Sequence, residues 1–315
     1  MGGASADSPL GELPGLVGEQ PRTGGETEGS VRYVGILVVL GAVLGGFVLS
    51  GGQVPVLIQP YELMVILGAA IGTLLIGLLP HQLASLQKKA LGVMGGSKYT
   101  IAGANEMLQL LFHLAIVVKK EGVIALESHI RDPEQSAIFS KYPTVLKNHH
   151  ALHFITDALR LQVDGAVAPE ELAVMLERTL DTHHEEESVV PGALQKMGDA
   201  LPGLGIVAAV LGIIITMSHL DGPPEEIGHH VAVALVGTFL GILMSYGFIQ
   251  PIVAAMEQEN RDEGNYFEAI RIGLCAFAEG KAPVVVVEMA RSALYSYNQP
   301  TREAVEEACK ALRAA

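Results

Sequence analysis

The sequence predicts an all-α integral membrane protein with four transmembrane helices in a two-plus-two arrangement and a large helical cytoplasmic domain between spans two and three. Half of the 315 residues are apolar and only 17% are charged, whereas about a quarter is usual for a soluble domain. Four largely uncharged stretches are long enough to cross a hydrocarbon core of about 30 Å. The 36 glycines also suit closely packed membrane helices.

The first pair of spans follows a polar N-terminal segment. Residues 1–31 are rich in Gly, Glu, Pro and Ser, so we expect them to be a disordered extension, or the chain to start near Val31. Within residues 32–80, span one runs from Tyr33 to Ser50, and span two follows Glu62 and continues to Pro80.

Residues 81–200 have a different composition. Charged residues return, and apolar residues such as Leu108, Leu111 and Phe112 recur at helical spacing. Another helix is predicted from Pro169, because Glu170 and Glu171 suit a first helical turn. We therefore predict a helical cytoplasmic domain with few or no strands.

The second pair of spans occupies residues 201–256. Span three is expected to begin after Leu201 and Pro202 and to end at Leu220, and span four runs from about Val231 to Met256. Residues 257–315 then form a charged tail with a helical pattern.

The basic residues predict the orientation in the membrane. The connectors 51–60 and 219–228 contain no Lys or Arg, whereas 81–200 and 257–315 hold nearly all of the chain's 20. Since cytoplasmic loops are enriched in basic residues, both termini are expected in the cytoplasm. The net charge of −14 argues against a nucleic-acid partner.

The predicted spans carry no Asp, Glu, Lys or Arg at mid-depth. A self-sufficient ion carrier normally has an ionisable group there, so the chain is either a passive scaffold or works with a partner that supplies this group. The polar candidates near mid-span are Thr73 and Thr238. The simpler explanation for each is a hydrogen bond to a carbonyl of its own helix.

Two prolines and three charged residues are further candidates. Pro202 and Pro251 lie at the cytoplasmic ends of spans three and four, either as ordinary helix punctuation or as hinges. Lys119, Lys120 and Glu127 lie near the end of the first long cytoplasmic helix. If that helix continued, Lys120 and Glu127 would share one face, which is either a solvated surface or a contact site.

No enzyme chemistry is indicated. The sequence has no nucleotide-binding loop, nucleophile elbow or paired catalytic carboxylates, so we predict no catalytic residues and no cofactor. Adjacent histidines point in different directions on a helix, and we therefore expect no metal site among the cytoplasmic histidines: His149, His150, His153, His183 and His184.

Several blocks resemble one family. These are YVGILVVLGAVLGGFVLSGG, QPYELMVILGAAIGTLLIG, GDALPGLGIVAAVLGI and VGTFLGILMSYGFIQP. In this order they resemble the MotA family of flagellar motor stator subunits, which is distantly similar to ExbB and TolQ, and the resemblance extends over about residues 33–300.

The resemblance implies a function. MotA-like subunits form a homo-oligomer, a ring of five around two copies of a MotB-type subunit whose single span carries the ion-accepting Asp. That partner would explain the missing acid in these spans. Ion flow turns the ring, and its cytoplasmic charges act on the rotor protein FliG.

The resemblance also implies residue roles. Pro202 and Pro251 match the prolines that couple ion flow to motion, and Thr238 matches a threonine facing the ion path. Ala209 matches a position that is Thr in sodium-driven relatives and Ala in proton-driven ones, which implies H⁺ as the coupling ion.

Two cytoplasmic positions match rotor-contacting residues. Glu127 matches the acidic one and Lys119 the basic one, which is usually Arg. Lys keeps the charge but lacks the planar two-pronged donor of Arg, so Lys120 is an alternative candidate for this contact.

Three other functions remain as alternatives. An ExbB/TolQ-type proton-driven energiser usually has three spans. A four-helix channel or solute carrier needs polar residues along a path within this chain. A passive membrane scaffold would leave Pro202, Thr238 and Pro251 without a role.

Overall fold

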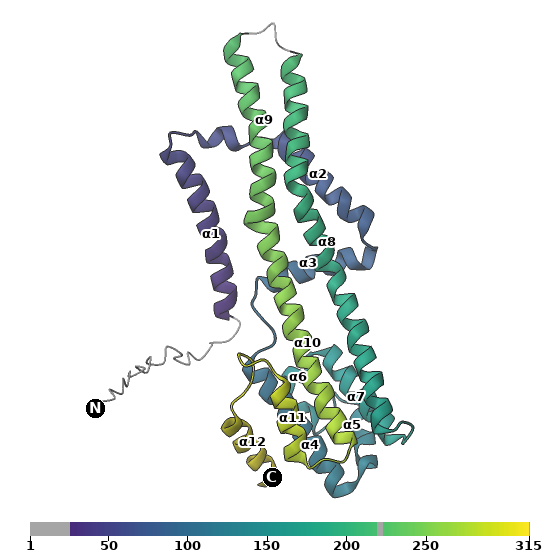
Figure 1. Ribbon diagram of the computed structural model, residues 1–315. Coiled ribbons are helices and arrows are strands. Elements are labelled where there is room, and N and C mark those ends of the chain that lie inside the picture. The colour runs from purple at the N-terminus through teal and green to yellow at the C-terminus, as the bar shows by residue number, and fades with distance from the viewer. Residues whose placement is uncertain (1–25, 219–222, 315) are drawn as a thin grey trace, which may run out of the picture.

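The computed structural model describes residues 26–218 and 223–314, and within these ranges the chain is helical and has no strand (Figure 1). The predicted all-α class is therefore confirmed. The long elements are α1 (Glu26–Leu49), α2 (Pro60–Gly77), α3 (Pro80–Val93), α4 (Ile101–Glu121), α7 (His149–Val163), α8 (Pro169–Met217), α9 (Pro224–Met244), α10 (Gln250–Ala278), α11 (Pro283–Ala293) and α12 (Arg302–Ala314). Short elements connect them: η1 (Val54–Leu57), η2 (Val123–Leu126), α5 (Glu127–Arg131), η3 (Phe139–Lys141), α6 (Pro143–Lys147) and the π-helical turn η4 (Ser245–Ile249).

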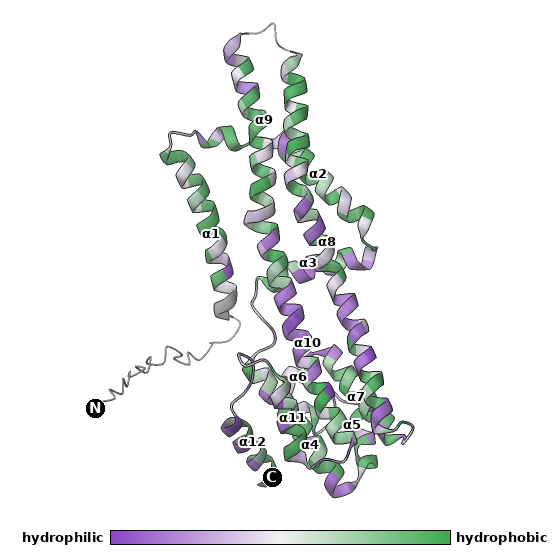
Figure 2. Cartoon of the chain, in the orientation of Figure 1, coloured by the Kyte–Doolittle hydropathy of each residue, from purple (hydrophilic) through white to green (hydrophobic). Residues whose placement is uncertain are grey.

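A long hairpin organises the molecule. Helix α8 has 49 residues, and α9, η4 and α10 return alongside it without a break in the helical path (Figure 1). The upper half of the hairpin is mostly apolar and the lower half mostly polar (Figure 2). This hairpin therefore connects the predicted membrane part directly to the predicted cytoplasmic domain.

The predicted start of span three lies inside a longer helix. Pro202 lies well inside α8, and so does a second proline, Pro191. An interior proline removes one helical hydrogen bond, which is why sequence patterns place a boundary there. Here the neighbouring helix replaces the missing donors, as described below.

Helices α1 and α2 lie on the upper part of the hairpin. Helix α2 packs against α8 and α9, whereas α1 stands apart from them (Figure 1). The lower end of α1 is held by a hydrogen bond from the Arg32 guanidinium to the carbonyl oxygen of Val93. Apolar side chains along α1 remain open, for example Val31 at 69% and Leu37 at 68% exposure.

The start of α1 differs from the expectation. The helix begins at Glu26, so residues 26–31 are helical although the extension was expected to be disordered. Residues 1–25 lie outside the described part of the chain.

Five helical stretches in the described residues are long and apolar enough to cross a membrane, by length and composition alone. They include the four predicted spans. The fifth is α4, and half of its apolar window is buried inside the protein. Its buried residues, among them Met107, Leu108 and Phe112, belong to the core of the lower domain.

The lower domain has a conventional helical core. Helix α4 packs against α11, α10 and α12, and α7 packs against α10. Thr100 caps the N-terminus of α4 by accepting a hydrogen bond from the amide of Gly103 at 3.2 Å. Burial of each large side chain here contributes about 1.5–3 kcal/mol, so this domain is a stable platform for the lower end of the hairpin.

Candidate functional site

Helices α8 and α9 cross at very short distance because glycines face each other. A Cβ atom added at Gly241 would lie 2.6 Å from the carbonyl oxygen of Leu201, and one at Gly205 would lie 2.8 Å from that of Gly237. Backbone atoms cannot yield as a side chain can, so any larger residue would push the helices apart. Small residues give membrane helices this kind of close contact.

This crossing brings together the segments that carry Ala209 and Thr238. Ala209 is 8% exposed, and its amide nitrogen is 3.4 Å from a Cβ placed at Gly237, the residue before Thr238. A Cβ placed at Gly205 would lie 3.2 Å from the Cα of Thr238. The two predicted ion-path residues therefore belong to one contact region.

The two mid-span threonines differ in their hydrogen bonds. The hydroxyl of Thr73 donates to the carbonyl oxygen of Ala70 at 2.7 Å, as expected for a threonine that serves its own helix. For the half-buried Thr238, no hydrogen bond is found among the described residues. Thr238 therefore differs from Thr73, whose hydroxyl is bonded within its own helix.

Glu62 is a candidate that the sequence analysis missed. It was treated as preceding span two, but α2 begins at Pro60, so Glu62 lies in the first turn and is only 8% exposed. Its Oε1 is 3.5 Å from a Cβ position at Gly212, and its Oε2 is 3.2 Å from one at Gly237. Proline followed two residues later by an acid is a typical helix start, and this signal places Glu62 inside the helix.

Pro202 creates an unpaired carbonyl that α9–α10 satisfies. Without an N–H at Pro202, the carbonyl oxygen of Gly198 has no donor from its own helix. The hydroxyl of Ser245 donates to this oxygen at 2.7 Å. Ser245 is fully buried and is the first residue of the π-helical turn η4.

The same arrangement occurs at the second interior proline, which the sequence analysis did not single out. Pro191 leaves the carbonyl oxygen of Glu187 without its helical donor. The side-chain amide of Asn260, on α10, donates to that oxygen at 3.0 Å. Both interruptions of α8 are therefore bridged by side chains of the returning helix.

Pro251 directly follows the π-helical turn. The amide of Gln250 donates to the carbonyl of Ser245, one residue farther back than in an α-helix. Gln250 also donates to Asp199 at 2.6 Å and accepts from Gln195 at 3.0 Å. The two predicted hinge prolines thus lie close in sequence to one group of hydrogen-bonded polar side chains, which joins α8 to α10.

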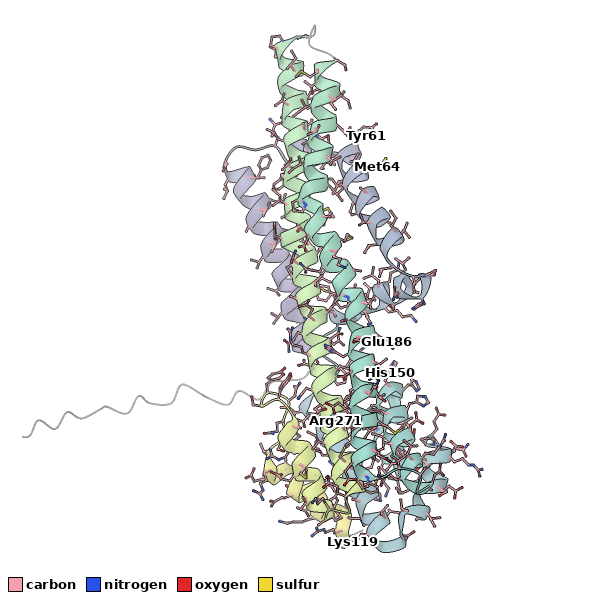
Figure 3. The ribbon with its side chains drawn as sticks, turned by 45° about the vertical axis from the view of Figure 1, so that its right-hand side comes forward. Tyr61, Met64, Lys119, His150, Glu186 and Arg271 are labelled. Atoms are coloured by element: carbon pink, nitrogen blue, oxygen red, sulfur yellow. The ribbon has the colours of Figure 1, made fainter. Side chains whose placement is uncertain are left out.

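The predicted rotor-contacting charges lie at the opposite end of the molecule. Lys119 and Lys120 are exposed in the last turn of α4, and Figure 3 shows Lys119 at the lower tip. Helix α4 ends at Glu121 and is followed by Gly122, whose φ is 87°, and the exposed Glu127 begins α5. The expectation that Lys120 and Glu127 share one helical face is therefore wrong, because glycine breaks the helix between them.

The histidines of the lower domain contact one another and an acidic residue. The rings of His150 and His183 are 5.4 Å apart, and His183 Nε2 is 3.6 Å from Glu263 Oε1. No group of three suitable ligands occurs in the residues that the structure describes. Glu263 also accepts a 2.7 Å hydrogen bond from the hydroxyl of Tyr99. Burial raises the pKa of Tyr99, so its phenol stays protonated and donates.

Comparisons with known proteins agree with this geometry. The Motility protein A N-terminal family model matches residues 33–122, and that of the MotA/TolQ/ExbB proton channel family matches residues 147–269. Motility protein A of Salmonella typhimurium is 37% identical over 280 residues, which cover 89% of this chain and 95% of the relative. The chemotaxis protein LafT of Vibrio parahaemolyticus is 37% identical over 276 residues, covering 88% and 97%.

Two solved structures share the fold. The C. jejuni MotAB structure matches with a TM-score of 0.69 at 21% identity, over 84% of this chain and 95% of that one. The flagellar MotAB stator complex from Bacillus subtilis matches with a TM-score of 0.68 at 22% identity, over 87% and 98%. Fold and matches together define a class of proton-channel membrane proteins rather than enzymes. Within this class, the chain belongs to the motility protein A family.

Proposed function

We propose that this protein is the ion-conducting stator subunit of a bacterial flagellar motor and converts proton flow into torque on the rotor. The observation that carries this proposal is the hairpin of α8 with α9–α10. It joins the close crossing around Ala209 and Thr238 to the domain that presents Lys119 and Glu127. The match covers 95% of motility protein A from Salmonella typhimurium, which favours this function over an ExbB/TolQ-type energiser.

Ion transfer requires a partner in this proposal. Ala209 and Thr238 carry no ionisable group, so the ion-accepting Asp comes from a MotB-type subunit with a single span. The Thr238 hydroxyl, without a hydrogen bond among the described residues, is suited to face that subunit. Ala209 offers no oxygen ligand, and hard cations such as Na⁺ need oxygen ligands, so H⁺ is the coupling ion.

The membrane arrangement follows from burial and charge. The four spans are α1, α2, the upper part of α8, and α9 with the turn after it. Helix α4 stays in the cytoplasmic domain because its apolar residues fill that domain's core. The distribution of basic residues supports cytoplasmic termini, and the spans of a stator subunit lie in the inner membrane.

The assembly is a ring of this subunit around the partner. The exposed apolar side chains of α1 are suited to contact lipid or a neighbouring copy. Five copies around two partners is the arrangement implied by the family. At the lower tip, Lys119 or Lys120 and Glu127 act on the rotor protein FliG.

Swimming of a deletion strain and proton flux through the wild-type complex test this proposal. The gene is deleted from its host, and the protein is then expressed again in that strain together with its single-span partner. We expect the deletion strain to build flagella that do not turn, and the complex to restore swimming in medium without sodium. A deletion strain that swims normally would contradict the stator function. Swimming that requires sodium would contradict only the choice of ion.

A further inference from the structure

Glu62 is exceptional among the buried polar side chains. Six polar or charged residues are buried in the part of the chain that the structure describes. Five of them have hydrogen bonds: Ser136, Thr156, Thr216, Ser245 and Asp262. For the carboxylate of Glu62, no hydrogen bond or ion pair is found within the described residues. Buried charged groups normally have partners, so an unpaired one indicates a function rather than a structural role.

The position of Glu62 points to the ion path. Its two carboxylate oxygens lie against Gly212 of α8 and Gly237 of α9. Gly237 precedes Thr238 in sequence, and a Cβ on it would lie 3.3 Å from the Cβ of Ala208. The absence of side chains at both glycines leaves room for the carboxylate. Glu62 is therefore next to the α8–α9 crossing whose segments carry Ala209 and Thr238.

The neighbours of Glu62 in α2 point elsewhere. Tyr61 and Met64 are 78% and 69% exposed, and Figure 3 shows both on the outer side of α2, away from the hairpin. Helix α2 thus turns its single acidic residue to the same inner face as the buried Ile66 and Ala70. Glu62 also lies at the start of α2, after the connector predicted to face the outside, and so on the entry side for protons.

We propose that Glu62 is a proton-binding residue of the ion path, on the entry side of the partner's carboxylate. The Glu62 carboxylate takes one proton from a hydronium ion in the outer solvent, which leaves water, and becomes a neutral carboxylic acid. It then gives this proton to the acceptor carboxylate of the partner and returns to the anion. A neutral carboxylic acid costs far less free energy to bury than a free cation in the same place. Binding to Glu62 would therefore lower the cost of bringing the proton into the membrane. This inference rests on the proposed stator function.

A helix-capping role is the main alternative. An acid in the first turn of a helix stabilises it through the helix dipole. Gln has nearly the same shape as Glu and still accepts hydrogen bonds, but it cannot carry a proton between two sites. Asp can carry a proton but has a shorter reach. The pair of substitutions Glu62→Gln and Glu62→Asp therefore separates proton transfer from packing.

The test measures proton flux and swimming of the complex with its partner in a stator-deletion host. We expect Glu62→Gln to lower the flux at least about tenfold, as for loss of a proton-transfer group, while partner co-purification stays normal. Glu62→Asp should keep part of the flux with a changed dependence on external pH. The matched control is Glu225→Gln, which changes an exposed acid at the start of α9 and should conduct like wild type.

Two results would overturn the proposal. Wild-type flux in Glu62→Gln would show that no proton passes through this residue. Loss of partner binding in Glu62→Gln would make it a packing residue. Neither result touches the stator function, which the flux and swimming of the wild-type complex test separately.

Discussion

Ser245 donates a 2.7 Å hydrogen bond to the carbonyl oxygen of Gly198, the group that Pro202 leaves without a donor in its own helix. The defect in one helix thereby becomes a link to the other. Asn260 and Glu187 repeat the arrangement at Pro191. Helix α8 is therefore joined to η4 and to α10 at the two places where a proline interrupts its hydrogen bonds, and a bend at either proline has to involve the returning helix.

The link at Ser245 can be removed by one substitution. Ser245→Ala leaves the buried carbonyl of Gly198 without any donor, which should cost about 1–3 kcal/mol. We expect a lower melting temperature of the purified complex and weaker torque. The control is Ser218→Ala, because Ser218 is exposed and bonds only within α8. An unchanged melting temperature for Ser245→Ala would show that this bond is not needed.

The link at Asn260 permits a double-mutant cycle. Asn260→Ala alone should destabilise the complex by about 1–3 kcal/mol, because the carbonyl of Glu187 loses its donor. In a Pro191→Ala background the helix supplies an N–H at that point, so the same Asn260 substitution should cost much less. Thermal unfolding of the four variants measures the difference. Equal costs in both backgrounds would refute the donor-replacement explanation.

Pro202 and Pro251 should be required for torque but not for assembly. Pro202→Leu restores an N–H and stiffens α8, and Pro251→Leu does the same after the π-helical turn. We expect both variants to reach the membrane, bind the partner and fail to turn the motor. Co-expression with wild type should impair swimming, because the inactive subunits occupy stator positions. Variants that no longer co-purify with the partner would instead identify these prolines as packing elements.

Gly241 should not tolerate a side chain. The Cβ of Gly241→Ala would lie 2.6 Å from the backbone oxygen of Leu201, so the helices must separate, at a cost of about 1–3 kcal/mol. Gly203→Ala is the matched control, since nothing lies within 4 Å of a Cβ there. We expect low yield of folded complex only for Gly241→Ala, measured by size-exclusion chromatography in detergent. Equal yields for Gly241→Ala and Gly203→Ala would contradict the close α8–α9 contact at Gly241.

Reversing the charge at Glu127 should impair swimming more than removing it. Exposed ion pairs contribute at most about 1 kcal/mol each, so Glu127→Gln should slow swimming only partly. Glu127→Lys replaces attraction with repulsion and should reduce soft-agar spreading further. Lys119→Gln and Lys120→Gln, compared separately, would show which lysine has the basic role. Normal spreading of Glu127→Lys at normal expression would identify these residues as a solvated surface.

Local composition predicted the helical class, because apolar stretches and helical periodicity are properties of short segments. The continuity of α8 was not predictable in this way. A proline signals a break, and only the contact of Gly198 with Ser245, far away in sequence, shows how the helix continues. Gly122 is the opposite case, because its break separates Lys120 from Glu127.

The contact region was predicted in part. Family resemblance pointed to Ala209 and Thr238, and the structure brings their segments together. Glu62 was missed because a charge at the edge of an apolar stretch is usually assigned to the water outside. Its burial depends on glycines in two other helices, Gly212 and Gly237, and no pattern within α2 reports on them.

The length of α8 has a mechanical consequence. At about 1.5 Å per residue, Pro169 lies about 50 Å from Pro202 along the helix. Each degree of bend at Pro202 would therefore move the far end of α8 by about 0.9 Å. Exposed charges in the cell interact over about 8 Å. A bend of roughly ten degrees would thus move the lower domain by about the distance over which its surface charges interact. A helix of this length can therefore convert a small change at the crossing into a displacement that makes or breaks a charged contact.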